Sequence, residues 1–303
     1  MKSSIFITGA SGFIGRKLLS KLSKLQAENI YCLSRNDHNE KGMQGCNAVR
    51  WIKGTLFDSN RFGKHLENCD TVIHMAALTG KARSQEYFEI NAKGTEFLIH
   101  ACKNAHVKNF LYMSSIAVKF RDISRYYYAQ SKQQAEEAVK SSGLHYAILR
   151  PTIVIGRESS IWASLSKAAK APIIPMFGDG KTKIQPIWVD DLVDIIMAII
   201  DNDNFYDRTY EVGGKEIVTM EQFLKSIHHF YYEKDPRVVH LSLKYVLPVL
   251  LFLETFFQKF MPFNAGQLSS FANDGIVDES NSFYDKDLQT KNIKAMIALA
   301  SGR

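Results

Sequence analysis

Apolar and polar positions follow two alternating patterns through the first half of the chain. Short apolar and β-branched runs predict six strands, at Ser4–Thr8, Asn29–Leu33, Ala48–Ile52, Thr71–Met75, Asn109–Met113 and His145–Leu149. Between them, longer amphipathic stretches predict helices, at Phe13–Leu25, Tyr87–Ala105 and Tyr126–Ser141. Strands that alternate with helices indicate a parallel sheet covered on both faces. Because crossovers between parallel strands are almost always right-handed, we expect a doubly wound α/β fold.

The pattern becomes less regular after Arg150. Three elements are expected there, namely a helix near Ile161–Ala171, a strand that ends at Val189, and a helix capped by Asp190 and Asp191. We therefore expect one large domain over residues 1–150. A smaller, mostly C-terminal lobe over residues 151–303 would share its core.

The balance of charge favours an anionic partner. The chain has 303 residues and a net charge of +7, which suits a phosphorylated cofactor, an acidic membrane surface or nucleic acid. Its basic residues are scattered and form no dense tract, so nucleic acid is not expected. The first predicted strand begins at Ser4 and leaves no room for a secretory signal. No uncharged apolar run approaches the ~20 residues that cross a bilayer, so a cytoplasmic protein is expected.

The four cysteines are widely spaced, at Cys32, Cys46, Cys69 and Cys102. This spacing indicates neither a zinc site nor a need for an oxidising compartment, and no metal is expected. Three of them lie in or beside predicted strands and helices, so we interpret them as small core residues.

A glycine-rich sequence joins the first predicted strand to the first helix. Gly9 would permit a tight turn, Gly12 would let the backbone approach a pyrophosphate, and Gly15 would let the helix pack on the sheet. The pyrophosphate would rest on unpaired N–H groups at the positive end of the helix dipole. We therefore expect a dinucleotide to contact Gly9, Ser11, Gly12, Phe13, Ile14 and Gly15. The alternative is a glycine-rich turn that binds no ligand.

The spacing of three positions from Gly9 to Gly12 resembles the glycine motif of the extended short-chain dehydrogenase/reductase (SDR) superfamily. The resemblance to this superfamily covers most of the chain. It implies a Rossmann-type fold that binds a nicotinamide dinucleotide. It also implies that Asp58 lies near the adenine, that the motif ending in Ala76-Ala77 lines the cofactor, and that Asn91 of the next helix contributes to the site.

The end of the second predicted strand distinguishes NAD from NADP. An NAD site normally has an Asp or Glu there, which accepts hydrogen bonds from the ribose 2′-hydroxyl. This chain has Ser34 and Arg35 instead, and Arg16 directly follows the glycine motif. Because guanidinium groups hold a 2′-phosphate, NADP(H) is expected, with NAD(H) as the alternative. Both arginines could also be ordinary solvated surface residues.

Tyr128 and Lys132 form a Tyr-x-x-x-Lys pair in the helix predicted after the fifth strand. Their spacing places both side chains on one helix face. A tyrosine pKa near ~10 must fall by ~2–3 units, about 3–4 kcal/mol, before the phenol exchanges protons near neutral pH. One ammonium group ~4 Å away contributes about 4 kcal/mol at an effective dielectric of ~20, before burial subtracts from it.

The SDR resemblance assigns a role to each polar side chain of this set. It implies that Tyr128 is the acid/base, that Lys132 lowers the tyrosine pKa and holds the ribose, and that Ser115 positions the reacting oxygen. Lys119-Phe120 replaces the Tyr-Gly usual in the family, so this loop is expected to differ in shape. The alternative is a structural Tyr/Lys pair in a protein without activity.

Motifs in the second half of the chain narrow the resemblance to one branch of the SDR superfamily. Pro151, in Arg150–Gly156, matches the SDR segment that passes over the nicotinamide. Ile184 and Gln185 stand where nucleotide-sugar enzymes usually carry an Arg-Asp pair, which makes a nucleotide sugar less expected. Three later motifs resemble the branch that contains the NADPH-binding accessory subunit of respiratory complex I and its bacterial relatives: Gln185–Val189, Tyr210–Gly214 and Gln267–Asp274.

Residues 243–263 are strongly apolar and carry a thin polar face. Three interpretations stay open: a buried helix, a lid over an apolar substrate, or an interfacial helix in peripheral contact with a membrane.

Two functions therefore remain. The first is an NAD(P)-dependent oxidoreductase or epimerase that acts on a carbonyl or alcohol of a small lipophilic or sugar-like molecule. The second is a catalytically silent NADPH-binding structural or assembly protein, peripheral to a membrane. The set of Ser115, Tyr128 and Lys132 favours the first. The oligomeric state stays open, a homodimer included.

Overall fold

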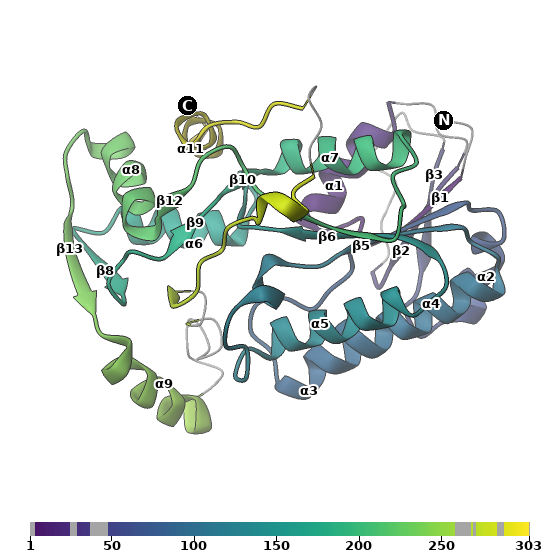
Figure 1. The fold of residues 1–303 in the computed structure, drawn as a ribbon, viewed down its shortest axis with the longest axis horizontal. Helices are drawn as coiled ribbons and strands as arrows, with labels where there is room; N and C mark the ends of the chain where they lie inside the picture. Colours follow the sequence, from purple (N-terminus) through teal and green to yellow (C-terminus); the bar gives the residue numbers. More distant parts are fainter. Residues whose placement is uncertain are drawn as a thin grey trace. The chain divides into compact units, whose positions relative to one another are not determined.

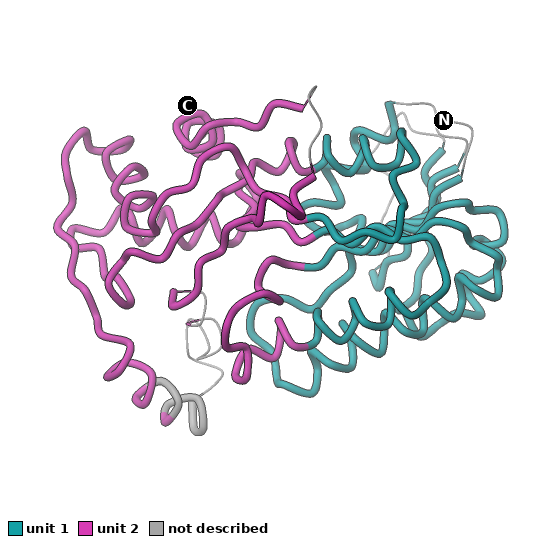
Figure 2. Tube along the Cα trace, viewed as in Figure 1, with its two compact units in different colours: residues 1–114, 131–149, 193–210 teal, residues 115–130, 150–192, 211–303 magenta. Residues whose placement is uncertain are grey.

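The computed structural model describes residues 4–24, 29–36, 48–257, 268, 271–283 and 288–302 (Figure 1). The chain divides into two compact units, coloured separately in Figure 2. The first unit comprises residues 1–114, 131–149 and 193–210, and the second comprises residues 115–130, 150–192 and 211–303. Each unit therefore combines separated segments of the chain, and the division expected near residue 151 stays a prediction.

One seven-stranded sheet carries the predicted strands. They are β1 (Ile5–Thr8), β2 (Ile30–Ser34), β3 (Val49–Lys53), β4 (Thr71–His74), β5 (Asn109–Met113), β6 (His145–Pro151) and β11 (Arg208–Val212). The strand order is β11-β6-β5-β4-β1-β2-β3, and the pairs from β3 through β6 are all parallel. Strands in the order 3-2-1-4-5-6 define the doubly wound Rossmann fold. The predicted fold class is confirmed.

The register of this sheet places several predicted site residues along one edge. Thr8 of β1 pairs with Leu33 of β2 and with His74 of β4, so these three strands end side by side. Gly9 and Ser34 follow at the same edge. Ligands of open α/β sheets bind outside the carboxyl ends of the strands, where the strand order reverses. Here that reversal lies between β1 and β4.

Helices cover both faces of the sheet. Figure 1 shows α2 (Ser59–Leu66), α4 (Gly94–Asn104) and α5 (Tyr127–Lys140) along one face and α1 (Phe13–Leu22) and α7 (Val189–Asp201) along the other. A salt bridge between Lys21 and Asp194 joins α1 to α7. The helix expected after Asp190 and Asp191 in fact begins at Val189. The two carboxylates therefore lie in its first turn, where they still face the positive end of the helix dipole.

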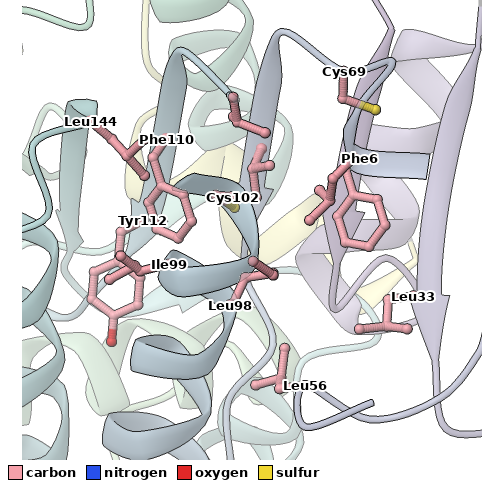
Figure 3. Close-up of a cluster of buried hydrophobic side chains, with 14 of the residues drawn as sticks. Phe6, Leu33, Leu56, Cys69, Leu98, Ile99, Cys102, Phe110, Tyr112 and Leu144 are labelled. Atoms are coloured by element: carbon pink, nitrogen blue, oxygen red, sulfur yellow. The ribbon is translucent and has the colours of Figure 1, made fainter. Parts of the chain in front are cut away.

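A cluster of buried hydrophobic side chains fills the space between the sheet and α2, α4 and α5 (Figure 3). Phe6, Val72, Phe110 and Ile148 reach it from four adjacent strands because alternate strand residues point to the same face. Cys69 and Cys102 belong to this cluster, and Cys32 is buried in β2. Burial raises the pKa of the Cys32 and Cys69 thiols to about 12, which keeps them unreactive. Cys46 lies outside the described residues.

The described part of the second unit contains three short strand pairs and four α-helices that lie wholly within it. The pairs are β7 (Val154–Ile155) with β10 (Ile187–Trp188), β9 (Lys183–Ile184) with β12 (Val218–Thr219), and β8 (Ile173–Phe177) with β13 (Arg237–Leu241). The helices are α6 (Ser160–Ala169), α8 (Met220–Tyr232), α9 (Leu243–Phe257) and α11 (Ile293–Ser301). The helix predicted near Ile161–Ala171 is α6, and the strand predicted to end at Val189 is β10.

Helix α9 exposes an apolar stripe. Tyr245, Val249 and Phe252, which recur at helical spacing, are 71%, 59% and 65% exposed. This face of the helix is not buried in the unit, so the interpretation of a fully buried helix is wrong for these positions. In the part of the chain that the structure describes, no helix is long and apolar enough to span a membrane. Residues 258–263 of the predicted segment lie outside the described residues.

Candidate cofactor and catalytic site

The glycine turn after β1 has the geometry expected of a dinucleotide loop. Gly9 has a φ of +77°, and a Cβ placed there would lie 2.6 Å from the Ala76 nitrogen. A Cβ at Gly15 would lie 2.2 Å from the Gly9 oxygen. Gly9 and Gly15 are therefore required by the fold itself. Gly12 is different, because it is exposed and a Cβ there would meet, among the described residues, only the Gly9 oxygen, at 3.1 Å.

The start of α1 presents backbone donors at this turn. Gly12 is the N-cap residue, and the first-turn N–H groups of Phe13, Ile14 and Gly15 have no acceptor within the helix. The Arg16 guanidinium donates to the Ser11 carbonyl at 2.7 Å, which adds a fixed positive charge beside the turn. Backbone donors, a helix dipole and a face without side chains fit the pyrophosphate of a nicotinamide dinucleotide.

Three other predicted cofactor residues lie at strand ends. Ser34 is buried at the end of β2, where its hydroxyl accepts from the Asn36 N–H at 3.4 Å, and Arg35 is exposed. Pro151 is buried at the end of β6. Arg35 is thus free of the core at the position where an SDR protein contacts the adenosine ribose, and its contact with a 2′-phosphate stays a prediction.

Asp58 is engaged in a local turn. Its carboxylate accepts from the Thr55 N–H at 2.7 Å and from the Thr55 hydroxyl at 2.8 Å. These two hydrogen bonds hold the Asp58 pKa below its ordinary value. The side chain therefore shapes the turn before α2, and its predicted contact with the adenine remains untested.

Asn91 lies within an irregular turn of the helical segment after β4. The helix predicted over Tyr87–Ala105 consists of α3 (Ser84–Tyr87), a π-helical turn η2 (Phe88–Lys93) and α4. The Asn91 amide accepts from the Leu78 N–H at 2.7 Å and donates to the Leu78 carbonyl and the Ser131 hydroxyl, both at 3.0 Å. It therefore ties the loop after β4 to α5. Single π turns of this kind occur frequently at functional sites.

Lys132 is a buried cation on α5. Its side chain is fully enclosed, and its Nζ donates to the Met113 carbonyl at 2.6 Å. The ammonium also lies over the Tyr112 ring, 4.3 Å from the centroid. Burial lowers the pKa of Lys132 to about 7, and the negative charge of Glu136 opposes this effect. A lysine of this kind is typical of sites that use its charge.

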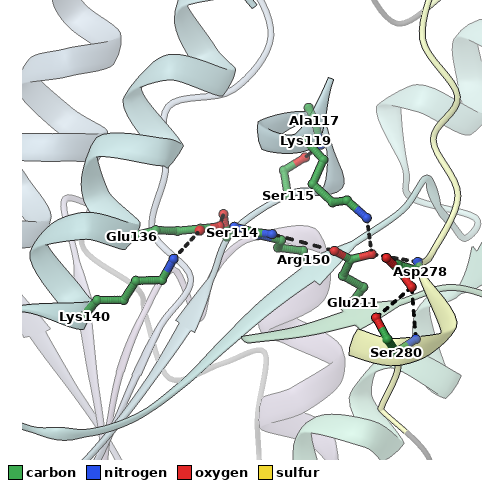
Figure 4. A network of polar contacts seen from close by, with 10 residues as sticks. All are labelled: Ser114, Ser115, Ala117, Lys119, Glu136, Lys140, Arg150, Glu211, Asp278 and Ser280. Atoms are coloured by element: carbon green, nitrogen blue, oxygen red, sulfur yellow. Dashed lines mark hydrogen bonds and ion pairs between the residues drawn. The ribbon is translucent and has the colours of Figure 1, made fainter. Parts of the chain in front are cut away.

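Ser114 and Ser115, at the end of β5, have different environments (Figure 4). The Ser114 hydroxyl is buried and donates to the Glu136 carboxylate at 2.6 Å. Ser115 is half-buried and caps the short helix η3 (Ile116–Lys119) by accepting from the Ala117 N–H at 3.2 Å. As an acceptor in this bond, Ser115 keeps its hydroxyl proton for donation, and its role at a substrate oxygen stays a prediction.

Tyr128 lies in the first turn of α5, one turn before Lys132. Its ring is 5.8 Å from the Tyr126 ring, which in turn stacks on Phe120. The Gln130 amide donates to two carbonyls of the preceding loop, at 2.7 and 2.8 Å, and so fixes the chain where α5 begins. Ser115 and Tyr128 belong to the second unit, whereas Lys132 belongs to the first.

A buried carboxylate, Glu211, joins three segments of the second unit (Figure 4). It accepts from Lys119 Nζ at 2.7 Å and from the Asp278 N–H at 2.8 Å. The Arg150 guanidinium lies 3.7 Å from its other oxygen. The lysine that replaces the usual family tyrosine is thus anchored to β11, which fixes the short helix that Ser115 caps.

Sequence reasoning did not select three of these polar residues: His74, Glu136 and Glu211. Each is nevertheless visible as an anomaly. His74 is the last residue of β4, a strand whose four residues are all buried. Glu136 follows Lys132 by one helical turn, and Glu211 lies in a strand next to the end of β6. Among the described residues, no group of three or more His, Cys, Asp or Glu side chains could hold a metal ion.

The comparisons with known proteins agree with this geometry. A family model described as the NAD dependent epimerase/dehydratase family matches residues 5–213. The chain belongs to this family. The match covers the whole Rossmann sheet and extends through the segment after β6, so the predicted SDR resemblance is confirmed.

Three curated relatives show the range of the family. The uncharacterised protein y4nG of Sinorhizobium fredii is 28% identical over 239 residues, which are 73% of this chain and 59% of that protein. The chain thus spans about three fifths of that relative. Subunit 9 of the NADH dehydrogenase 1 alpha subcomplex of Arabidopsis thaliana is 24% identical over 95% of this chain and 74% of that protein. The UDP-glucose 4-epimerase of Vibrio cholerae is 27% identical over 73% of this chain and 74% of that protein.

Among solved structures, a UDP-glucuronic acid 4-epimerase from Bacillus cereus in complex with NAD superimposes with a TM-score of 0.68 at 22% identity. The superposition covers 79% of this chain and 87% of that chain. At this identity the likeness shows a shared fold.

Proposed function

We propose that this chain is an NADP(H)-dependent oxidoreductase or epimerase that acts on a carbonyl/alcohol pair of a small molecule. The observation that carries the proposal is the enclosed Lys132 ammonium, one helical turn from Tyr128. Burial of this lysine opposes its charge, as the lowered pKa shows. A fold that maintains such a group without using the charge would gain stability by replacing it with an apolar side chain.

The roles of the side chains follow from their positions. When bound, the nicotinamide would supply or accept a hydride at the substrate carbon. Tyr128 would hold the proton that moves to or from the substrate oxygen, and the charge of Lys132 would favour the phenolate form. The hydroxyl of Ser115 would donate a hydrogen bond to the same oxygen. Glu136 supports this arrangement by raising the pKa of Lys132 against burial.

Two positions of the second unit favour a substrate other than a nucleotide sugar. Ile184 is buried and pairs with Val218, so its side chain belongs to the core of the unit. Gln185 accepts from the Val277 N–H at 2.9 Å and donates to the Gly214 carbonyl at 2.7 Å. Neither residue offers a cation for a diphosphate, which the two epimerase relatives must accommodate in their UDP-linked substrates.

The experiment that tests the proposal is a turnover assay with NADPH and NADH over a panel of small ketones and aldehydes. UDP-glucose serves as the comparison substrate. We expect NADPH-dependent turnover of a carbonyl compound, and we expect Tyr128→Phe to remove it while cofactor binding stays unchanged. Tight cofactor binding without turnover over the whole panel would contradict the enzymatic function and favour an assembly role.

The exposed stripe of α9 favours a second, independent proposal. We propose that Tyr245, Val249 and Phe252 contact an acidic membrane surface. Apolar and aromatic side chains at helical spacing insert into the headgroup region, and the net charge of +7 favours anionic lipid. This contact would bring the protein to lipophilic carbonyl compounds.

A further inference from the structure

A continuous chain of hydrogen bonds, buried except at its first, part-buried bond, connects the glycine turn with the π-helical turn of the first unit. The Ala76 N–H donates to the Thr8 hydroxyl at 3.2 Å, and that hydroxyl lies 2.6 Å from His74 Nδ1. On the other side of the ring, His74 Nε2 lies 2.8 Å from the Thr95 hydroxyl. The Thr95 hydroxyl donates to the Asn91 carbonyl at 2.6 Å.

The direction of every bond in this chain follows from its two ends. A carbonyl can only accept, so the single proton of the Thr95 hydroxyl points to Asn91. His74 Nε2 must then carry the hydrogen that the Thr95 oxygen accepts. Burial and, to a smaller extent, the charge of Lys132 together lower the His74 pKa to about 3, so the ring is neutral at pH 7. Nδ1 is therefore an acceptor, and the Thr8 hydroxyl donates to it.

The first end of the chain fixes the backbone beside the glycine turn. The ladder between β1 and β4 ends with the bond from the Met75 N–H to the Thr8 carbonyl, at 3.0 Å. The Thr8 hydroxyl extends this pairing by one residue, to Ala76. A Cβ on Gly9 would lie 2.6 Å from the Ala76 nitrogen, so the position of this peptide determines the path of the turn.

The second end fixes the turn that contains Asn91. The Asn91 carbonyl, within the π-helical turn, accepts from the Thr95 hydroxyl, so this turn is tied to the first turn of α4. The Asn91 amide reaches Leu78 in the loop after β4 and Ser131 on α5. Ser131 immediately precedes Lys132. Displacement of this turn would therefore displace the helix that carries the lysine.

We propose that His74 is a positioning residue that holds the glycine turn and the Asn91 turn in register, so that the cofactor loop and the Lys132 helix move as one body. This inference rests on the proposed function, because the glycine turn and Lys132 matter for activity only if the cofactor binds. The ring itself is buried, so it acts through the groups that it contacts. It transmits position through its two nitrogens, and only a neutral imidazole with its proton on Nε2 satisfies both neighbours.

Two near-isosteric substitutions test the inference at opposite ends of the chain of hydrogen bonds. Thr8→Val and Thr95→Val each remove one hydroxyl, and Thr71→Val serves as the control, a buried threonine of β4 outside the chain of bonds. The readouts are NADPH affinity by calorimetry and amide hydrogen exchange at residues 76–78 and 91–95. We expect both variants to weaken NADPH binding, roughly tenfold for a lost buried hydrogen bond, and to increase exchange at both segments.

The effect of Thr95→Val on the glycine turn is the decisive readout, because Thr95 lies at the other end of the chain of hydrogen bonds. Faster exchange at residues 76–78 and weaker NADPH binding in Thr95→Val support the proposal. Changes confined to the segment that carries the substitution, or equal to those of Thr71→Val, would overturn it. Nitrogen-15 spectra of the histidine rings, with the His74 signals identified by their loss in His74→Asn, must show the Nε2–H tautomer at pH 7, and any other form also overturns it.

These readouts separate the two proposals. If the unsubstituted protein binds neither NADPH nor NADH, the proposed function fails. The exchange and tautomer measurements still decide whether His74 joins the two turns. If the cofactor binds and the two exchange patterns stay independent, the positioning role fails and the proposed function stands.

Discussion

Replacement of the enclosed lysine gives a quantitative test of its electrostatic state. Lys132→Met removes the charge and keeps most of the side-chain volume. Burial lowers the pKa of Lys132 from an ordinary 10.5 to about 7 in the folded protein. Between these two values the unfolded chain binds more protons than the folded protein, so the free energy of unfolding rises with pH across this window. The methionine variant lacks this contribution.

The magnitude shows which comparison is informative. A lowering of about 3.5 pKa units corresponds to about 5 kcal/mol of stability lost at low pH. Lys132→Met also removes the hydrogen bond to Met113 and the contact with the Tyr112 ring. The difference in stability between the two proteins at one pH therefore combines several contributions. The change of this difference with pH reports the titration of Lys132 alone. The linkage relation gives about 2–3 kcal/mol for this change between pH 6 and pH 9.

The assay is urea unfolding of the cofactor-free protein at several pH values from 6 to 9. We expect the unsubstituted protein to gain about 2–3 kcal/mol relative to Lys132→Met over this range. Lys103→Met, an exposed lysine on α4, is the control and should run parallel to the unsubstituted protein. Parallel curves for Lys132→Met as well would show that the lysine is solvated, and the account of its charge would be refuted.

Three further predictions follow from the same contacts. Glu136→Gln removes the charge that raises the Lys132 pKa. In the same unfolding measurements, the pH range over which the free energy of unfolding rises should therefore extend to lower pH. An unchanged range would contradict the interaction between Glu136 and Lys132. Arg35→Ala should weaken NADPH binding by roughly tenfold or more and leave NADH binding nearly unchanged, since only the 2′-phosphate loses a partner; equal losses by calorimetry would argue against NADP(H) selection. Serine at three exposed positions of α9 should abolish flotation with anionic vesicles while turnover persists, and unchanged flotation would remove the membrane proposal; the positions are Tyr245, Val249 and Phe252.

The sheet could be predicted closely because its strands carry a simple signal. All six predicted strands agree with the structure to within two residues, since each is a short apolar run bounded by turns or helices. The helix after β4 was predicted as regular, whereas Asn91 lies in a π-helical turn. That turn depends on contacts with Leu78 and Ser131, which are distant in the sequence. A periodicity of apolar residues contains no information about such contacts.

The site was predictable where a motif fixes local geometry. Gly9, Gly12 and Gly15 appear in the turn expected from their spacing, and Lys132 is one turn from Tyr128. The supporting residues were not predictable, because their roles depend on pairing across the fold. The partner of Lys119 is Glu211, 92 positions later, and no local pattern links them. The second unit is likewise assembled from separated segments, and no local sequence pattern predicts which segments combine.

The central claim is that a nicotinamide dinucleotide binds where β1 turns into α1, and calorimetric titration of NADPH into Gly12→Ala tests it most directly. A methyl group at Gly12 approaches only the Gly9 carbonyl among the described residues, so the fold should tolerate it, while the pyrophosphate would meet it. Gly63→Ala on α2, where a Cβ enters open space, is the control. We predict that the unsubstituted protein and Gly63→Ala bind NADPH equally and that Gly12→Ala binds at least about tenfold more weakly. Equal binding by all three proteins, or no heat with any of them, would contradict the account.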